Sequence, residues 1–201
     1  MPTQRQKNAL KTKQKIIDIA SELISNGDFN DFSIEKITKA CGVAKGTFYT
    51  YFKNKEELSN IVCRQFFNHI AFRIQKMKDK SFIERLEHYF ISFMVEVERY
   101  GINICREWSK NVIDPNASKE GWDNSKWQFD IDMLSEILSK AVADKELKSD
   151  TPVELITHTI ICELYGMMTC WCMSDGTFNP LDYADKIFNL DVKPMISNYL
   201  S

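Results

Sequence analysis

Glycine and proline are scarce in this chain, with 7 and 5 copies among 201 residues. Such low counts exclude a collagen-like repeat or a Gly- and Pro-rich disordered chain, and 44% hydrophobic residues favour a compact helical protein. The N-terminus is polar and lacks the apolar segment of a secretory signal. The six cysteines are irregularly spaced and form no C-x2-C pair, so we expect reduced thiols in a cytoplasmic protein.

Motifs that carry enzyme chemistry are missing as well. The three histidines, His69, His88 and His158, stand in no metal-ligand pattern, and neither a G-x-S-x-G motif nor a Gly-rich phosphate loop is present. We therefore expect no enzyme, no catalytic residue, no metal and no cofactor. Cys170 and Cys172 would point about 200° apart on a helix, which disfavours a shared metal, although a thiol-responsive regulator remains an alternative.

Only one long hydrophobic run is found, from Leu155 to Met173, and His158 and Glu163 are the only members of the His, Asp, Glu, Lys and Arg types within it. A helix that is apolar on all sides must be covered on all sides. A membrane span is one explanation, but the ionisable residues and several threonines do not suit lipid. We expect instead no membrane contact, with one face buried in the protein's own core and the other against a second subunit.

The remaining hydrophobic residues recur at helical spacing, and no strand pattern is found. Local start signals support the helices: Ser81 with Glu84 forms a capping box, and Thr151-Pro152 reads as a cap followed by a first-turn proline. The sequence predicts an all-α protein of about nine helices, with Phe29 and Phe32 plugging a small N-terminal core and a loop over 116–125. The clearest predicted helices cover 10–26, 54–78, 82–100, 105–112, 127–141, 152–173 and 180–199, with a kink or end near Pro194.

Residues 33–58 read as two short helices around a tight turn, followed by the start of a third. Ser33 is a good N-cap, and Gly42 suits a sharp turn because glycine adopts positive φ without steric cost. Asn54 caps the next helix, with Glu57 as its capping-box partner. This layout is that of a helix-turn-helix, in which the second helix enters the DNA major groove.

The second of these helices has two different faces. Ala44, Phe48 and Tyr51 share the side that would pack on the preceding helix, with Thr47 at its margin. The opposite side offers groups that reach base edges and phosphates, and a solvated αα-hairpin is the plainer alternative. These outward residues are Lys45, Gly46, Tyr49 and Thr50. The charge distribution favours the DNA-binding interpretation, because residues 1–60 carry a net charge of +3 while residues 61–201 carry −5. The N-terminal arm contains no acidic residue and suits phosphate contact through Arg5, Lys7, Lys11, Lys13 and Lys15.

The run G-V-A-K-G-T-F-Y-T-Y-F-K-N-K-E-E-L resembles the DNA-binding signature of the TetR family of transcriptional regulators, and the resemblance covers about residues 10–60. It implies an all-α homodimer, usually a repressor that a small molecule releases from its operator. By the same resemblance, Lys45 and Gly46 lie at the groove floor, Thr47 and Thr50 at its edge, and Ser33, Tyr49, Tyr51 and Lys55 meet phosphates. Thr50 departs from the family pattern, in which an aromatic residue is common at this position.

The resemblance divides the chain into a helix-turn-helix domain over 1–54, linked by the helix from 54, and a ligand-binding and dimerisation domain over 55–201. Pairing is expected through helices near 152–173 and 180–199. Aromatic and methionine side chains are plentiful in the second domain, where each either fills the core or lines a pocket for an apolar or aromatic effector. The pocket candidates are Phe90, Phe93, Trp108, Trp127, Tyr165 and Met168.

The sequence therefore predicts a cytoplasmic DNA-binding regulator, associated with the nucleoid when bound, that recognises a palindromic double-stranded operator as a dimer. A ligand- or protein-interaction module with a vestigial helix-turn-helix is the alternative.

Overall fold

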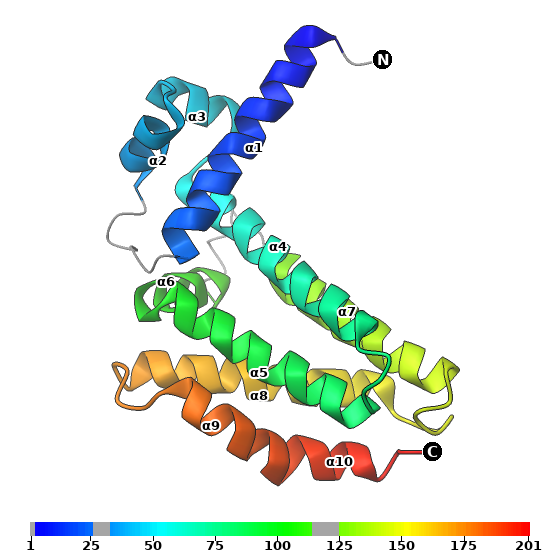
Figure 1. Cartoon of the computed structure of the whole chain (residues 1–201). Helices are drawn as coiled ribbons and strands as arrows, with labels where there is room; N and C mark the ends of the chain where they lie inside the picture. The colour runs from blue at the N-terminus through cyan, green and yellow to red at the C-terminus, as the bar shows by residue number, and fades with distance from the viewer. Residues whose placement is uncertain (1–2, 26–32, 114–124) are drawn as a thin grey trace. The chain divides into compact units, whose positions relative to one another are not determined.

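The computed structural model describes residues 3–25, 33–113 and 125–201, and the regular secondary structure within these ranges is helical, apart from an isolated antiparallel bridge between Leu147 and Leu200 (Figure 1). The predicted all-α class is confirmed. Phe29, Phe32 and residues 116–124 of the predicted loop lie outside the described residues, and Ser125 already opens a helix. The helices are α1 Gln4–Ser25, α2 Ile34–Cys41, α3 Lys45–Tyr51, α4 Lys55–Lys76, α5 Phe82–Tyr100, α6 Ile102–Ile113, α7 Ser125–Ala143, α8 Val153–Met173, α9 Pro180–Ile187, a π-helical turn Phe188–Val192 and α10 Lys193–Ser197.

The chain divides into two compact units, and α4 takes part in both. The first contains Met1–Phe66 together with Arg99–Gly101, so the first turns of α4 group with the helix-turn-helix. In this unit α1 packs on α2 and α2 packs on α3. Apolar stripes at helical spacing build the shared core, because each helix buries one side only. Its main members are Ile16, Ile17, Ala20, Ile24, Ile37, Cys41, Phe48, Phe52, Leu58 and Val62.

The second unit contains residues Phe67–Glu98 and Ile102–Ser201. Its central element is α8, which packs against α6, α7 and α9. The side of α8 that faces these helices is buried, as at Ile156, Ile160 and Leu164. Leu155 and Met173, near its two ends, are exposed. The predicted burial of one face against the protein's own core is confirmed, and none of the described helices is long and apolar enough to cross a membrane.

Two helix boundaries differ from the sequence prediction. Thr151 does not cap α8: the N-cap is Pro152 without a side-chain bond, and Thr151 Oγ1 donates instead to the Lys148 carbonyl at 2.6 Å. The last predicted helix is divided, because a π-helical turn separates α9 from α10. Pro194 stands in the first turn of α10, and its missing N–H gives a physical reason for the changed hydrogen-bond spacing just before it.

Candidate functional site

The turn between α2 and α3 forms as its residues predict. Ser33 Oγ accepts a hydrogen bond from the Lys36 amide at 3.2 Å and so caps α2. Gly42 closes the helix in the left-handed region, with φ 68° and ψ 34°. Its N–H donates to Lys39 O and the next N–H, of Val43, donates to Thr38 O, which satisfies carbonyls at the end of α2. The entry angle of α3 is therefore set by backbone geometry that favours glycine.

Two buried phenyl rings hold α3 in place. Phe48 is fully buried, Phe52 is 1% exposed, and their ring centroids lie 5.3 Å apart. Because these rings bury one side of α3, the residues on the opposite side of the helix face solvent, as the 3.6-residue period requires. Ala44 was expected to pack inward, but it is exposed because it is the N-cap and precedes the helix proper.

The outward side of α3 carries the predicted DNA-facing residues. Lys45, Gly46, Tyr49 and Thr50 are all exposed. Tyr49 keeps half of its surface in solvent while its ring meets Phe48 edge-on at 5.5 Å. A Cβ added at Gly46 would meet no atom within 4 Å, so neither local space nor backbone strain requires glycine there. The four residues therefore form one accessible surface, which we call the α3 outer face; their roles toward DNA stay predictions.

Three of the other predicted contacts are less open. Thr47 and Tyr51 are half-buried, the latter with its ring 6.5 Å from Phe52. The Ser33 oxygen already accepts an amide, which leaves its O–H as the group that could donate to a phosphate. Thr50 Oγ1 donates to the Gly46 carbonyl at 3.2 Å, so its oxygen lone pairs are the part directed outward.

One functional neighbour was missed by sequence reasoning. The Lys45 ammonium is paired with the Glu35 carboxylate on α2, and both side chains are more than half exposed. The hydrogen bond between them lowers the pKa of Glu35 and raises the pKa of Lys45, so both groups are charged near neutral pH. The sequence gives little indication of this pair. Glu35 stands in the first turn of α2, where acidic residues are common, and no local pattern points to a partner ten residues later.

The N-terminal arm splits into two parts. Lys15 Nζ donates to the Cys41 carbonyl at 2.9 Å, so it caps the end of α2 and does not extend as a free phosphate ligand. Lys13 lies over the Phe52 ring, 5.5 Å from its centroid. Arg5 and Lys7 remain exposed with solvent around them. Lys13 and Lys15 thus already have partners within the protein, and phosphate contact by the five basic residues stays a prediction.

The start of α4 adds cations beside a helix N-terminus. Asn54 Oδ1 accepts from the Glu57 amide at 2.9 Å, and the Glu57 carboxylate accepts from the Lys53 amide at 2.7 Å. The Glu57 carboxylate therefore accepts from the amide of Lys53, one residue before the predicted partner, Asn54. Lys53 and Lys55 are exposed on this turn, which suits contact with an anion.

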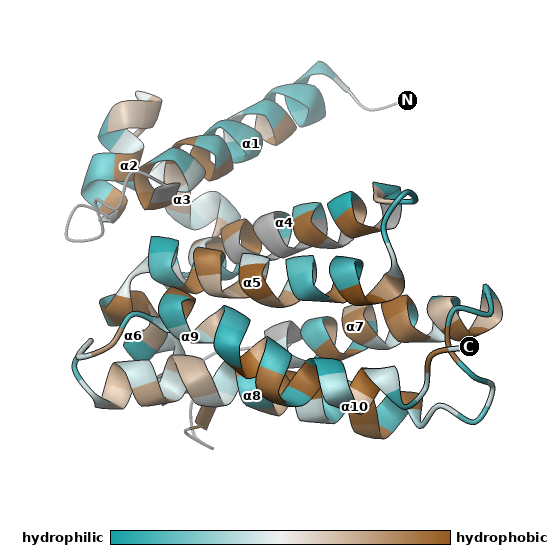
Figure 2. Cartoon of the chain, turned by 60° about the horizontal axis from the view of Figure 1, so that its bottom comes forward, coloured by the Kyte–Doolittle hydropathy of each residue, from teal (hydrophilic) through white to brown (hydrophobic). Residues whose placement is uncertain are grey.

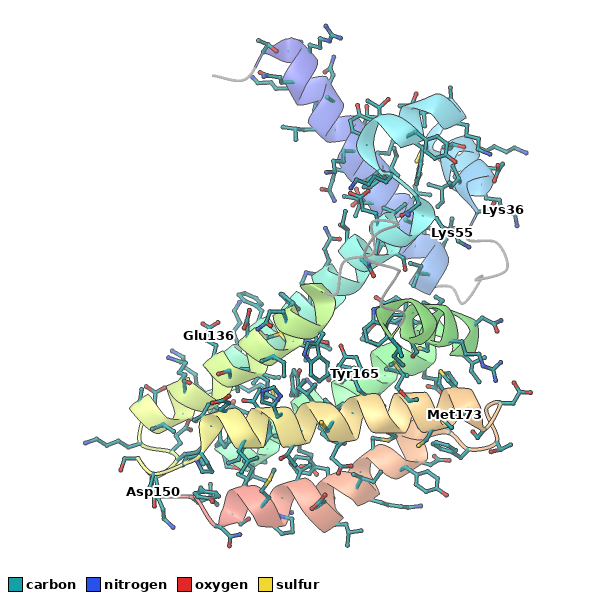
Figure 3. The ribbon with its side chains drawn as sticks, turned by 180° about the vertical axis from the view of Figure 1, so that it is seen from behind. Lys36, Lys55, Glu136, Asp150, Tyr165 and Met173 are labelled. Carbon is teal, nitrogen blue, oxygen red and sulfur yellow. The ribbon has the colours of Figure 1, made fainter. Side chains whose placement is uncertain are left out.

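A second candidate site lies in the other unit, around Tyr165 of α8. Three aromatic rings surround the Tyr165 ring, with centroid distances of 5.7, 5.1 and 5.3 Å to Phe93, Trp108 and Trp127. Its hydroxyl donates to the carboxylate of Asp130, which is fully buried. Figure 3 shows Tyr165 pointing from α8 toward the side of α6 and α7. Trp108, Trp127 and Tyr165 are only half-buried, so the cluster combines partly accessible rings with a buried acidic side chain.

Four of the six pocket candidates, Phe93, Trp108, Trp127 and Tyr165, thus lie together in one cluster. The other two have different surroundings. Phe90 turns to Phe188 of the π-helical turn, with ring centroids 5.7 Å apart. Met168 is buried in α8. Asp130 was missed from the sequence, where it looked like an ordinary polar residue of an amphipathic helix. No group of three or more metal-ligating side chains occurs among the described residues.

Fold and surface together define a helix-turn-helix protein with a separate helical unit. Residues 16–60 match the family model described as bacterial regulatory proteins, tetR family. The chain is 25% identical over 189 residues to the fatty acid metabolism regulator protein of Bacillus subtilis, covering 88% of this chain and 91% of that protein. It is also 31% identical over 90 residues to IcaR of Staphylococcus epidermidis, a negative transcriptional regulator of the biofilm operon icaADBC, covering 44% and 49% of the two chains.

Among solved structures, the chain is similar to the transcriptional regulator FadR of Bacillus subtilis in complex with stearoyl-CoA. The TM-score is 0.62 at 22% identity, covering 92% of this chain and 97% of that one. Residues 16–60 therefore carry the DNA-binding domain of the TetR family, and the chain is a DNA-binding transcriptional regulator.

Proposed function

We propose that this regulator is a repressor that binds a palindromic operator as a homodimer and is released by an apolar or aromatic small molecule. The α3 outer face carries the proposal: an exposed cation, a bare backbone, a phenol and a hydroxyl lie on one side of a helix whose other side is anchored. The site of action is the nucleoid in the cytoplasm.

Each residue of the interface has a proposed role. Lys45 donates to guanine acceptors at the groove floor, and Gly46 lets the backbone approach the bases. Thr47 and Thr50 are hydrogen-bonding groups at the groove edge, and the Lys45 amine must leave Glu35 to reach a base. The residues proposed to meet phosphates and fix the register are Ser33, Tyr49, Tyr51 and Lys55.

Dimerisation is proposed through α8 and the α9–α10 segment, with residues 1–54 as the DNA-binding part and 55–201 as the ligand-binding and dimerisation part. Leu155, Met173 and Leu190 expose 66%, 81% and 82% of their surfaces. Figure 2 shows hydrophobic residues on the visible faces of α8 and α10. Gly166, midway along α8, is exposed and has nothing within 4 Å of a built Cβ, which suits the close approach of a second helix. A second copy of this chain is the proposed occupant.

The effector site is proposed at the Tyr165 cluster. Half-buried aromatic rings suit an apolar or aromatic ligand, and a few convergent polar groups orient such ligands in pockets. The similarity to a regulator solved with stearoyl-CoA supports a long-chain acyl thioester as the first effector to test. Because α4 belongs to both units, a ligand that favours one position of α4 would change the spacing of the two recognition helices.

The experiment is a gel-shift titration of DNA from upstream of the protein's own gene, with and without stearoyl-CoA. Wild type should bind, and stearoyl-CoA should weaken binding about five-fold or more, as ordinary allosteric coupling does. Tyr165→Phe, Trp108→Leu and Trp127→Leu should reduce that response while leaving binding without ligand unchanged. Equal affinities with and without stearoyl-CoA would eliminate this effector class, and absence of any DNA binding would favour the interaction-module alternative.

A further inference from the structure

The start of α6 and the end of α8 bring two cysteines together inside the second unit. Cys105 and Cys172 are both buried, at 4% and 7% exposure. Cys172 Sγ lies 4.0 Å from the carbonyl oxygen of Ile102, the first residue of α6, and Cys105 is one turn further along that helix. Cys105 Sγ lies 3.6 Å from the Val97 carbonyl.

The contact between these helices is held by Arg106, the neighbour of Cys105. Its Nε and Nη2 donate to the Cys172 carbonyl at 3.0 and 2.7 Å, and Nη2 also donates to Asp175 at 2.6 Å. The Arg106 guanidinium is thus held against the backbone of Cys172. This guanidinium places a positive charge beside the pair.

The surroundings of Cys172 differ from those of an inert buried thiol. The hydrogen bond from Cys105 and the charge of Arg106 lower the pKa of Cys172, although burial alone acts in the opposite direction. In contrast, burial raises the pKa of Cys41, which has only Lys15 as a cationic neighbour. A thiolate, and not a thiol, is the species that reacts with oxidants. Cys172 is therefore the thiol that reacts more readily with an oxidant, and Cys105 is close enough to form a disulfide with it afterwards.

We propose that Cys105 and Cys172 form a reversible intramolecular disulfide that makes DNA binding responsive to hydroperoxides. This input is separate from the ligand response proposed above. It requires no partner subunit, because both cysteines belong to one unit of one chain. The exposed Cys170, two residues earlier in α8, points away from Cys172 and takes no part.

The chemistry balances with the peroxide as the only oxidant. The Cys172 thiolate attacks one oxygen of hydrogen peroxide; the O–O bond breaks, a sulfenic acid forms, and the hydroxide that leaves takes up a proton to become water. The Cys105 sulfur then attacks Cys172 Sγ; the S–S bond forms, the S–O bond breaks, and the departing hydroxide takes the Cys105 proton as a second water. Two thiols are oxidised by two electrons in total, and a thiol reductant reverses the step by exchange.

The position of the pair gives the disulfide a route to DNA binding. Cys105 is in the first turns of α6, which starts directly after the segment Arg99–Gly101, and that segment groups with the DNA-binding unit. Gly101, between α5 and α6, has φ 75°, a conformation favourable for glycine where the chain changes direction. A disulfide would join α6 covalently to α8 beside this corner, and through it the oxidation state of the pair would reach the segment that groups with the DNA-binding unit.

The test uses full-length protein treated with a small excess of hydrogen peroxide, blocked with N-ethylmaleimide and digested without reduction. Trypsin cleaves after Arg106 and chymotrypsin after Trp171, so Cys105, Cys170 and Cys172 fall on different peptides. We expect a linked Cys105–Cys172 peptide two hydrogens lighter than the sum of its parts, lost on reduction. Cys105→Ser and Cys172→Ser should abolish it, while Cys162→Ser and Cys170→Ser should retain it.

The second readout is affinity for a DNA fragment that the reduced wild type binds. Oxidation should change this affinity about five-fold or more, the low end of ordinary coupling, and reduction should restore it. Peroxide should leave the affinity of Cys172→Ser unchanged. If that variant does not fold, the peptide map of wild type decides alone. Oxidation confined to Cys162 or Cys170, or a Cys105–Cys172 bond without any change in affinity, would overturn the proposal.

Discussion

The Lys45 ammonium at the start of α3 is paired with the Glu35 carboxylate in the first turn of α2. The pair crosses the turn of the helix-turn-helix and lies on the surface that is proposed to meet DNA. On the proposed role of Lys45, its ammonium must exchange this carboxylate for a base or a phosphate when DNA binds. We therefore expect Glu35 to oppose DNA binding.

Glu35→Gln should tighten DNA binding. It removes a negative charge near the phosphates and frees Lys45, and because exposed ion pairs contribute at most about 1 kcal/mol, the gain should not exceed about five-fold. The slope of log affinity against log salt should become steeper by up to about one unit, since one more cation is available. Glu136→Gln on α7 removes the same charge elsewhere and should change neither value. Weaker binding by Glu35→Gln at low salt would show that the carboxylate positions Lys45 productively.

Gly46→Ala should stabilise the folded protein but weaken its binding to DNA. The free protein has open space at this position, so alanine should raise the free energy of unfolding by about 0.5–1 kcal/mol through its helix propensity. The added methyl group lies where the backbone is proposed to approach the bases, and affinity should fall about ten-fold or more, as for loss of a good base contact. Ser139→Ala on α7 is the control for added helix propensity. Urea unfolding and gel-shift titration give both values; unchanged affinity for Gly46→Ala would remove Gly46 from the interface.

Tyr165→Phe should destabilise the protein, whereas Tyr89→Phe should not. The Tyr165 hydroxyl donates to the buried Asp130 carboxylate, so its removal should cost about 1–3 kcal/mol. The Tyr89 hydroxyl is fully buried and has no hydrogen-bond partner within the described part of the chain, and burial and the Asp130 charge raise its pKa well above the usual value. Removing this hydroxyl should leave the free energy of unfolding unchanged or raise it. Equal losses in both variants, measured by urea unfolding, would contradict this difference.

Glu84 should make the start of α5 sensitive to acid. The amide and hydroxyl of Ser81, both at 2.9 Å, and the Lys80 ammonium lower the pKa of Glu84 to about 2. Because the folded-state pKa lies below the unfolded value, the contribution is complete above about pH 4.5 and is lost as pH falls toward 2. The difference in unfolding free energy between wild type and Glu84→Gln should shrink across this window. A difference that stays constant from pH 6 to pH 2.5 would rule out the proposed role of ionised Glu84.

Features determined by neighbouring residues were predictable from the sequence. Ser33, Gly42 and the Ser81–Glu84 capping box act within one turn of the chain, and each forms as predicted. Phe48 was placed on the inner side of α3 by the helical period alone. The Thr151 cap failed because its hydroxyl found a carbonyl partner three residues earlier, which no start signal excludes.

Contacts between distant residues could not be predicted in this way. Glu35 and Lys45 meet only because the turn brings α2 and α3 into a particular register. Tyr165 and Asp130 meet across the α7–α8 packing, and the Cys105–Cys172 contact depends on how α6 lies on α8. Periodicity shows which side of each helix turns inward, but not which residue of another helix it will meet. For this reason the α3 outer face was predictable as a surface, whereas its ion pair and the Tyr165–Asp130 bond were not.

The central claim, that the α3 outer face reads DNA as part of a dimer, is tested most directly by selecting bound duplexes from a random pool with full-length protein and sequencing them. We expect a palindrome whose half-sites are about 34–36 Å apart or slightly more. Lys45→Ala should blur the preference at one position in each half-site, whereas Tyr49→Ala should weaken binding to all sequences. Recovery of no enriched sequence, or of the same palindrome at undiminished affinity with both variants, would contradict it.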